Sequence, residues 1–184
     1  METFREIRRA YKLQMPALKA SAESADSIDP YFYDWQFTPI EDAVWQDIRG
    51  FGLPMFPQLP VNKYFVDFGN PFLKIAVECD GKQWHDKQKD NKRDQELMSE
   101  GWTIYRIPGN VCKKVLPAPW EIDKEFMEGD EYMNAGNKWF TETATGLVYA
   151  IKQKHFSDGS ENVWCSKFRD AYDKTLTFYR SYGI

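Results

Sequence analysis

Three acidic residues within strand-like, mostly apolar sequence constrain this chain more than any other feature. Asp67, Glu78 and Asp80 all lie between Gln58 and Arg106. Burying a carboxylate costs several kcal/mol unless it is paired or binds a metal ion. Carboxylates that converge from neighbouring strands are a plausible site for a hard cation such as Mg²⁺. The sequence therefore predicts metal-assisted chemistry on a β-sheet.

The placement of these acids depends on how two expected strands pair. Residues 73–79 alternate between apolar and polar side chains, and residues 61–68 form the preceding strand. In a hairpin whose paired residue numbers sum to 145, Asp67 lies opposite Glu78. A turn at Asn70 separates the two acids instead, and the sequence leaves both registers open.

Helix-like and strand-like patterns alternate along the chain, which indicates a mixed α/β fold. Pro16 is expected to stop or bend the first helix, and residues 20–30 to form a loop. The aromatic residues 31–37 are suited to covering a core edge or to stacking on bases, and packing is favoured because most buried aromatic side chains fill space. A third strand is expected at residues 102–107. The expected helices cover residues 2–15, 39–50, 86–100, 121–133, 139–155 and 163–182.

Glu41 has two possible roles. Thr38 is a suitable N-cap, Pro39 suits the first turn, and Glu41 completes a capping box. This structural role explains Glu41 fully, so a catalytic role needs independent support.

Composition limits the classes of function. The 184-residue chain has a formal net charge of −4, which gives no global indication of the basic surface usual in nucleic-acid-binding proteins. A basic cluster follows the acidic residues, but interspersed acids favour a solvated helix face on charge alone. The basic residues are Lys82, Lys87, Lys89, Lys92 and Arg93, and the acids are Asp86, Asp90, Asp94 and Glu96.

The cysteines and the apolar runs indicate the compartment. Three widely spaced cysteines do not form a disulfide framework. The sequence contains no CxxC pair, which argues against a structural zinc site. The charged N-terminal sequence lacks the apolar core of a signal peptide, and no apolar run approaches the roughly 18 residues that span a bilayer. We therefore expect a cytoplasmic protein with reduced thiols and no membrane contact.

An ordered set of short motifs over residues 38–110 resembles the very-short-patch-repair-like endonuclease domains of the PD-(D/E)XK, or restriction-endonuclease-like, nucleases. That branch carries a helix glutamate, a Gln before the first core strand, an Asp-Phe pair, an E-x-D-G-x-x-H element, a D-x-x-R-D helix and an Arg on the following strand. The matching positions here are Glu41, Gln58, Asp67 with Phe68, Glu78 to His85, Asp90 to Asp94, and Arg106.

The resemblance implies Mg²⁺- or Mn²⁺-dependent hydrolysis of DNA phosphodiester bonds, in repair, restriction or phage-related processing. Asp67 and Glu78 are similar to the two metal-binding acids of the superfamily, and the backbone carbonyl of Cys79 is a candidate further ligand. Such a cation neutralises charge that develops on the phosphate and helps to deprotonate water. Glu41 is a candidate to approach the same site from its helix.

One position departs from the wider superfamily, which has Lys two residues after the Glu. Here that position is Asp80, an acid also common in this branch. The general base and the charge stabiliser are therefore unassigned, and His85 is the best candidate for proton transfer because its pKa lies near neutrality. The alternative for His85 is a hydrogen-bonded structural residue. Candidate DNA contacts are Gln58, Lys82 and Arg93.

The resemblance also implies the domain organisation. We expect an N-terminal helix and linker at residues 1–37, a restriction-endonuclease-like core at residues 38–112 and a helical extension at residues 113–184 packed on that core. The core is expected to hold a mixed central β-sheet flanked by helices. The C-terminal helices offer a surface for a homodimer or a larger protein complex.

Three other functions fit the sequence. The first is a catalytically degenerate nucleic-acid-binding module or inhibitor on a nuclease fold. The second is an interaction protein that binds through its aromatic C-terminal helices. The third is a nuclease subunit whose partner recognises DNA. Metal affinity that depends on Asp67 discriminates an active site from a degenerate one.

Overall fold

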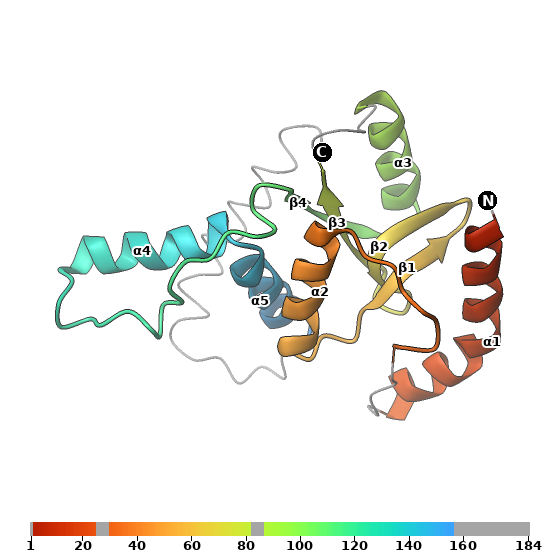
Figure 1. Cartoon of the computed structure of the whole chain (residues 1–184), viewed down its shortest axis with the longest axis horizontal. Coiled ribbons are helices and arrows are strands. Elements are labelled where there is room, and N and C mark those ends of the chain that lie inside the picture. The colour runs from red at the N-terminus through yellow and green to blue at the C-terminus, as the bar shows by residue number, and fades with distance from the viewer. Residues whose placement is uncertain (1, 25–29, 82–86, 157–184) are drawn as a thin grey trace. The chain divides into compact units, whose positions relative to one another are not determined.

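The computed structural model describes residues 2–24, 30–81 and 87–156 and contains a four-stranded β-sheet with the strand order β1-β2-β3-β4 (Figure 1). β1 pairs with β2, and β2 with β3, in antiparallel orientation. β4 runs parallel to β3, because Thr103 N donates to Lys74 O before β3 and Gly109 N donates to Asp80 O at its end. The sheet is therefore mixed, as predicted. The strands are Phe56–Val61 (β1), Tyr64–Asn70 (β2), Ile75–Asp80 (β3) and Thr103–Pro108 (β4).

Five helices accompany the sheet within the described ranges, and the α/β class with C-terminal helices is confirmed. The chain divides into two compact units. The first contains residues 1–38, 54–78 and 85–106, and the second contains residues 39–53, 79–84 and 107–184. The helices are Glu2–Ser24 (α1), Pro39–Gly50 (α2), Lys87–Ser99 (α3), Gly129–Glu142 (α4) and Ala144–His155 (α5).

The core of the first unit combines α1, the aromatic segment 31–37 and the sheet. Trp35 is buried, and its Nε1 donates to Pro30 O at 2.7 Å. The packing role predicted for residues 31–37 is therefore confirmed. The buried cluster contains Ile7, Tyr11, Leu18, Trp35, Phe56, Leu59, Val61, Val66, Ala76, Leu97, Trp102 and Ile104.

α1 is longer than predicted. It continues through Pro16 to Ser24, so the prediction of a loop from residue 20 is wrong for residues 20–24. Proline removes one backbone donor, but packing of an apolar face supplies most of the stability of a helix in a protein. Leu18, two residues after Pro16, is fully buried and anchors the second half of α1.

The segment before Asn70 forms two strands, whereas one was predicted. β1 and β2 form a hairpin with Asn62 and Lys63 between them, and Asn62 has a φ of +53°. β1 contains two prolines, Pro57 and Pro60. β1 is an edge strand, where a proline costs no ladder hydrogen bond on the open side.

The structure decides between the two registers that the sequence left open. Phe68 pairs with Val77, and Gly69 pairs with Ala76. These residue numbers sum to 145, so the register is the one that sets Asp67 level with Glu78.

α3 matches its prediction closely and ends in a Schellman motif. Trp102 N donates to Leu97 O at 3.1 Å, and Gly101 N donates to Met98 O at 2.9 Å. Gly101 has a φ of +89°, which only glycine adopts without strain. Since Leu97 is fully buried, this end of α3 is fixed in the core of the first unit.

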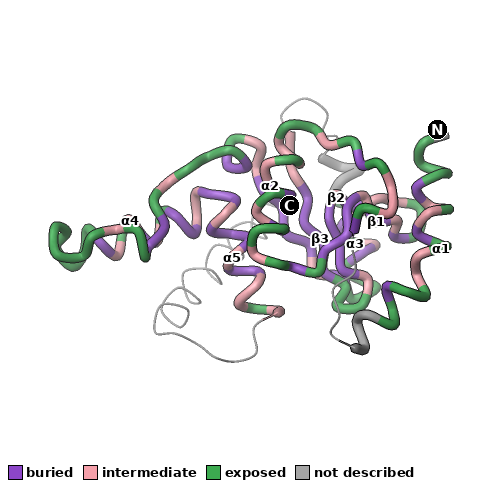
Figure 2. Tube along the Cα trace, turned by 60° about the horizontal axis from the view of Figure 1, so that its bottom comes forward, coloured by how far each residue is buried: buried purple, intermediate pink, exposed green. Residues whose placement is uncertain are grey.

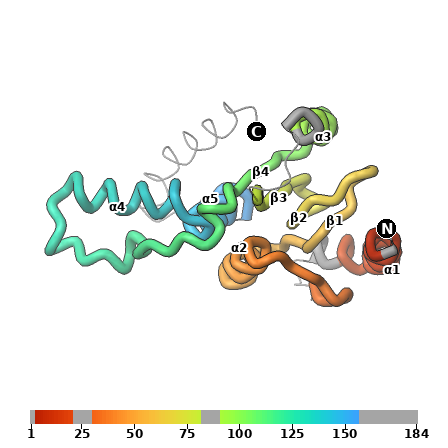
Figure 3. The backbone as a smooth tube through the Cα atoms, turned by 45° about the horizontal axis from the view of Figure 1, so that its top comes forward, coloured from red at the N-terminus to blue at the C-terminus, as the bar shows by residue number. Residues whose placement is uncertain are grey.

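The helices of the second unit begin and end elsewhere than predicted. The expected helix 121–133 is wrong in its first part, because α4 begins at Gly129. The expected helix 139–155 is divided at Thr143, whose side chain accepts from Gly146 N at 3.0 Å and caps α5. The chain before α4 runs back alongside it (Figure 3). The rings of Trp120 and Trp139 are in contact, with centroids 5.1 Å apart. The expected helix 163–182 lies outside the described residues.

Candidate active site

Asp67 and Glu78 lie on neighbouring strands of the first unit, close enough for the charge of Asp67 to raise the pKa of Glu78. The register that pairs Phe68 with Val77 sets Asp67 level with Glu78 one step along. Opposite residues of an antiparallel pair share a face of the sheet, with Cβ atoms about 5 Å apart. The two acids predicted from the sequence to bind metal are therefore brought together.

Gln58 belongs to the same row of the sheet. Its neighbours Pro57 and Leu59 pair with Phe68 and Val66, so Gln58 is level with Asp67. Its φ is +44°, and its Nε2 donates to Gln36 O at 3.2 Å. The backbone of Gln58 thus extends the row of acids to β1, while its amide holds the chain that leads into α2.

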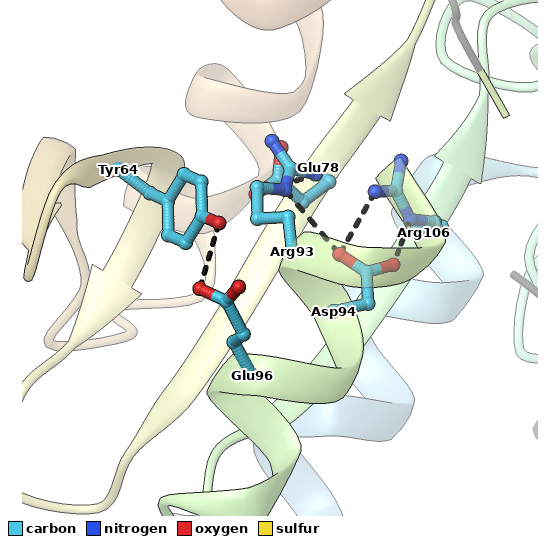
Figure 4. Close-up of polar contacts among 6 residues, drawn as sticks. All are labelled: Tyr64, Glu78, Arg93, Asp94, Glu96 and Arg106. Atoms are coloured by element: carbon cyan, nitrogen blue, oxygen red, sulfur yellow. Dashed lines mark hydrogen bonds and ion pairs between the residues drawn. The ribbon is translucent and has the colours of Figure 1, made fainter. Parts of the chain in front are cut away.

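Glu78 is almost completely buried, with 5% of its surface exposed. Its Oε1 has no hydrogen-bond partner among the described residues. Arg93 Nη2 lies 3.4 Å from Oε1, as an ion pair without hydrogen-bond geometry (Figure 4). A buried carboxylate oxygen left in this state costs free energy that a bound cation would recover.

The surroundings of Glu78 raise its pKa well above the usual value for a glutamate. Burial is the largest cause, and the charge of Asp67 adds to it. Arg93 and Arg106 lower the pKa but only partly offset these effects, and Asp94 opposes them. A buried acid with a second, partly exposed acid close by attracts a cation strongly.

A buried ion pair fixes the helix that carries Arg93. Arg106 Nε donates to Asp94 Oδ2 at 2.8 Å, and Arg106 Nη2 donates to Asp94 Oδ1 at 3.1 Å (Figure 4). This bidentate ion pair connects β4 to α3. Arg93 Nε lies 3.3 Å from Asp94 Oδ1. With 18% of its side chain exposed, Arg93 thus bridges Asp94 and Glu78.

A second contact ties α3 to the hairpin of β1 and β2. Tyr64 OH donates to Glu96 Oε2 at 2.8 Å (Figure 4). Lys63 Nζ lies 2.8 Å from the same oxygen. These bonds lie near the surface. Together with the Asp94 and Arg106 pair they orient α3 so that Arg93 points at Glu78.

The remaining predicted residues fall into two groups. Glu41, Cys79 and Asp80 belong to the second unit, where the Ile40 side chain lies within 3.5 Å of the Cβ position at Gly81. The start of α2 thus lies beside the end of β3. Lys82 and His85, for which the sequence predicts a DNA contact and proton transfer, lie outside the described residues.

The residues of the first unit fit a divalent cation in part. No group of three or more His, Cys, Asp or Glu side chains within the described ranges is arranged as a metal site. The predicted set needs only two carboxylates, because main-chain carbonyls and water supply further oxygen ligands for Mg²⁺. The unbonded Oε1 of Glu78 beside Asp67 is the observation that favours such an ion.

The sequence placed Asp94 on a charged helix but did not reveal its strongest contact. Arg106, buried on β4, makes both short bonds to Asp94. An arginine at an inward position of a strand was the available signal, since such a charge is seldom buried without a partner.

Comparison with known proteins agrees with this core. Residues 40–111 match the family model REase_MTES_1575, which describes a restriction-endonuclease-like family. The chain is 32% identical over 97 residues to an uncharacterised protein of Haemophilus influenzae, and the alignment covers 50% of this chain and 80% of that protein. The chain belongs to this restriction-endonuclease-like family.

Membership of the family suggests nuclease activity and implies a DNA substrate. Domains of this kind generally use divalent metals. No solved structure matches the chain significantly. None of the described helices is long and apolar enough to cross a membrane.

Proposed function

We propose that this protein is a divalent-metal-dependent endonuclease that hydrolyses DNA phosphodiester bonds, with Asp67 and Glu78 as its metal-binding side chains. One observation carries the proposal: Glu78 is buried opposite Asp67, with its Oε1 unbonded among the described residues. A structural acid at this depth would have a hydrogen-bond partner for each oxygen. This acid lies within the region that matches the family.

The chemistry follows from the charges of the site. A bound Mg²⁺ or Mn²⁺ supplies charge neutralisation at the phosphate and lowers the pKa of a water. Asp67 and Glu78 would hold the ion, and its charge would keep Glu78 ionised. Arg93 would keep Glu78 oriented, and as the least buried member of the ion-pair network it is also the one best placed to contact a phosphate.

Further roles follow from the family resemblance. We assign a third ligand oxygen to the Cys79 carbonyl, next to Glu78 on β3, and proton transfer to His85. Glu41 and Asp80, on neighbouring elements of the second unit, are further candidate catalytic acids. Gln58 and Lys82 are proposed DNA contacts. Very-short-patch-repair-like specificity and a role in repair, restriction or phage-related processing belong to the same proposal.

A second candidate is a nuclease-like subunit or binding module without catalysis. The observation that favours it is the ion pair between Arg93 and Glu78, since an arginine can replace the cation that a degenerate site no longer binds. The acid at position 80 in place of the superfamily's Lys points the same way. Metal binding separates the two candidates.

The test is a cleavage assay on supercoiled plasmid and single-stranded DNA with Mg²⁺, Mn²⁺ or EDTA. Wild type should cut with metal, and Asp67→Asn and Glu78→Gln should remain folded without cutting. Asp47→Asn is the matched control, because it neutralises a half-buried acid of the second unit. Retained cleavage in either site variant refutes the assignment. Folded wild type that neither cuts nor binds Mg²⁺ supports the second candidate.

A further inference from the structure

α1 carries a stripe of basic side chains on its exposed side. Arg5, Arg9 and Lys12 are all exposed, and their spacing of four and three residues places them within an arc of about 60° on a helix of 3.6 residues per turn. Figure 2 shows exposed and buried positions alternating along α1. The opposite side of the helix is the buried one, with Ile7, Tyr11 and Leu18.

This stripe contrasts with the acidic character of the whole chain. Residues 1–20 carry five basic and two acidic side chains, while the chain has a net charge of −4. Neither acid lies on the arc of the stripe, and Glu6 accepts a hydrogen bond from Tyr33 OH at 3.3 Å. The remaining arginine of this segment, Arg8, makes a structural contact instead, because its guanidinium lies over the Phe65 ring. The stripe is thus separate from the structural contacts of α1.

The stripe has the chemistry of a phosphate-binding surface. One guanidinium group can donate two parallel hydrogen bonds to a phosphate, and the ammonium group of Lys adds a point charge. Arg5 and Lys12 are about 10 Å apart along the helix axis, a length that covers several phosphates of a duplex. A membrane-binding helix needs a free apolar face. The apolar face of α1 formed by Ile7, Tyr11 and Leu18 is already buried, and Tyr11 OH donates to Pro57 O on β1.

We propose that α1 binds the phosphate backbone of duplex DNA through Arg5, Arg9 and Lys12. α1 lies outside the residues that match the family, so this contact would be an addition to the shared nuclease core. α1 and the Asp67–Glu78 pair belong to the same compact unit, and β1, on which α1 packs, is the neighbour of the strand that carries Asp67. The inference that this DNA is the cleaved substrate rests on the proposed function.

The experiment measures binding without cleavage. Fluorescence anisotropy of a labelled 30-base-pair duplex is recorded over a salt series in a Glu78→Gln background, with and without Arg5→Gln, Arg9→Gln and Lys12→Gln together. Glutamine keeps the helix propensity of the residues it replaces. Three lost phosphate contacts should reduce the slope of log K against log salt by about 2.7, since each contributes about 0.9. When the salt is raised from 50 to 200 mM, the loss of affinity should therefore be about 40-fold smaller for the α1 variant than for its parent.

The matched control removes the same charge from the second unit, through Lys113→Gln, Lys124→Gln and Lys138→Gln, all at exposed positions. Its slope should equal that of the parent. A variant with Arg5→Lys and Arg9→Lys in the same parent keeps all three charges and should retain most of the slope. An unchanged slope in the α1 variant, or an equal loss in the control, overturns the proposal. Binding to anionic lipid vesicles that depends on α1, without binding to duplex, overturns it in favour of a membrane surface.

This readout is independent of catalysis. Wild type that binds duplex through α1 but does not cut plasmid contradicts the proposed nuclease function and supports the DNA-binding role of α1. Wild type that cuts plasmid with no change in slope for the α1 variant supports the nuclease and contradicts the role of α1.

Discussion

Glu78→Gln should make the protein more stable at neutral and alkaline pH while abolishing cleavage. Glu78 is buried, its Oε1 is unbonded among the described residues, and its pKa is raised well above the usual value, first by burial and then by Asp67. Its ionised form therefore opposes folding. Glutamine has nearly the same shape and removes the charge, and Arg93 retains its contact with Asp94.

Glutamine remains a buried polar group, so the gain comes from removing the charge. The free energy of unfolding at pH 8 should rise by on the order of 1 kcal/mol or more, since one unit of pKa shift corresponds to about 1.4 kcal/mol. A raised pKa in the folded state means that the folded protein binds a proton which the unfolded chain releases near pH 4.5. Wild type should therefore lose stability as the pH rises from 4.5 towards the folded pKa, and the variant should lack this loss. The difference between them should disappear below pH 4.5.

The assay is urea unfolding followed by tryptophan fluorescence from pH 4 to 8.5, in EDTA and in Mg²⁺. Mg²⁺ should stabilise wild type and leave Glu78→Gln unchanged. Glu96→Gln is the opposing control, because Lys63 and Tyr64 lower the pKa of Glu96 and its charge favours folding. A Glu78→Gln variant less stable than wild type at pH 8 would refute the reasoning and identify Glu78 as a structural partner of Arg93.

Three further changes test other contacts. Asp94→Ala should cost about 3–5 kcal/mol in urea unfolding, because it strands the buried Arg106, and Asp94→Leu with Arg106→Met should recover much of the loss. Gly146→Ala should cost at least about 1–3 kcal/mol in thermal unfolding, because its Cβ would lie 2.2 Å from Trp139 O. Asp47 is half-buried with its pKa raised to about 6. Asp47→Asn should therefore stabilise the protein by about 1 kcal/mol at pH 8, a value reduced for solvent screening, and the gain should disappear below pH 4. Equal stability of Asp47→Asn and wild type at pH 8 would contradict the raised pKa.

The sequence predicted the class of fold and the central acids because both depend on short-range patterns. Alternation identified β3, and the expected helix at residues 86–100 differs from α3 by one residue at each end. The pairing of Asp67 with Glu78 depends on a turn in which both registers have suitable residues. Only the packing of the complete sheet selects one of them.

The errors have a common physical cause. Proline at position 16 was weighed as a local breaker, but tertiary packing outweighs the local cost. The boundary at Thr143 was missed because the apolar spacing continues from α4 into α5, and a single side-chain cap divides them. Arg106 was recognised as a motif residue, but its partner could be found only from the meeting of β4 with α3.

The two compact units have a consequence for how this chain is made and studied. Each unit is assembled from three separate stretches, and the chain passes between them at residues 38–39, 53–54, 78–79, 84–85 and 106–107. Neither can be expressed as one contiguous fragment. During translation the first unit cannot close until residue 106 has left the ribosome, by which time two stretches of the second unit have already emerged. A truncation that passes residue 38 from the N-terminus, or residue 107 from the C-terminus, would therefore remove parts of both units at once, whereas point substitutions can address them separately.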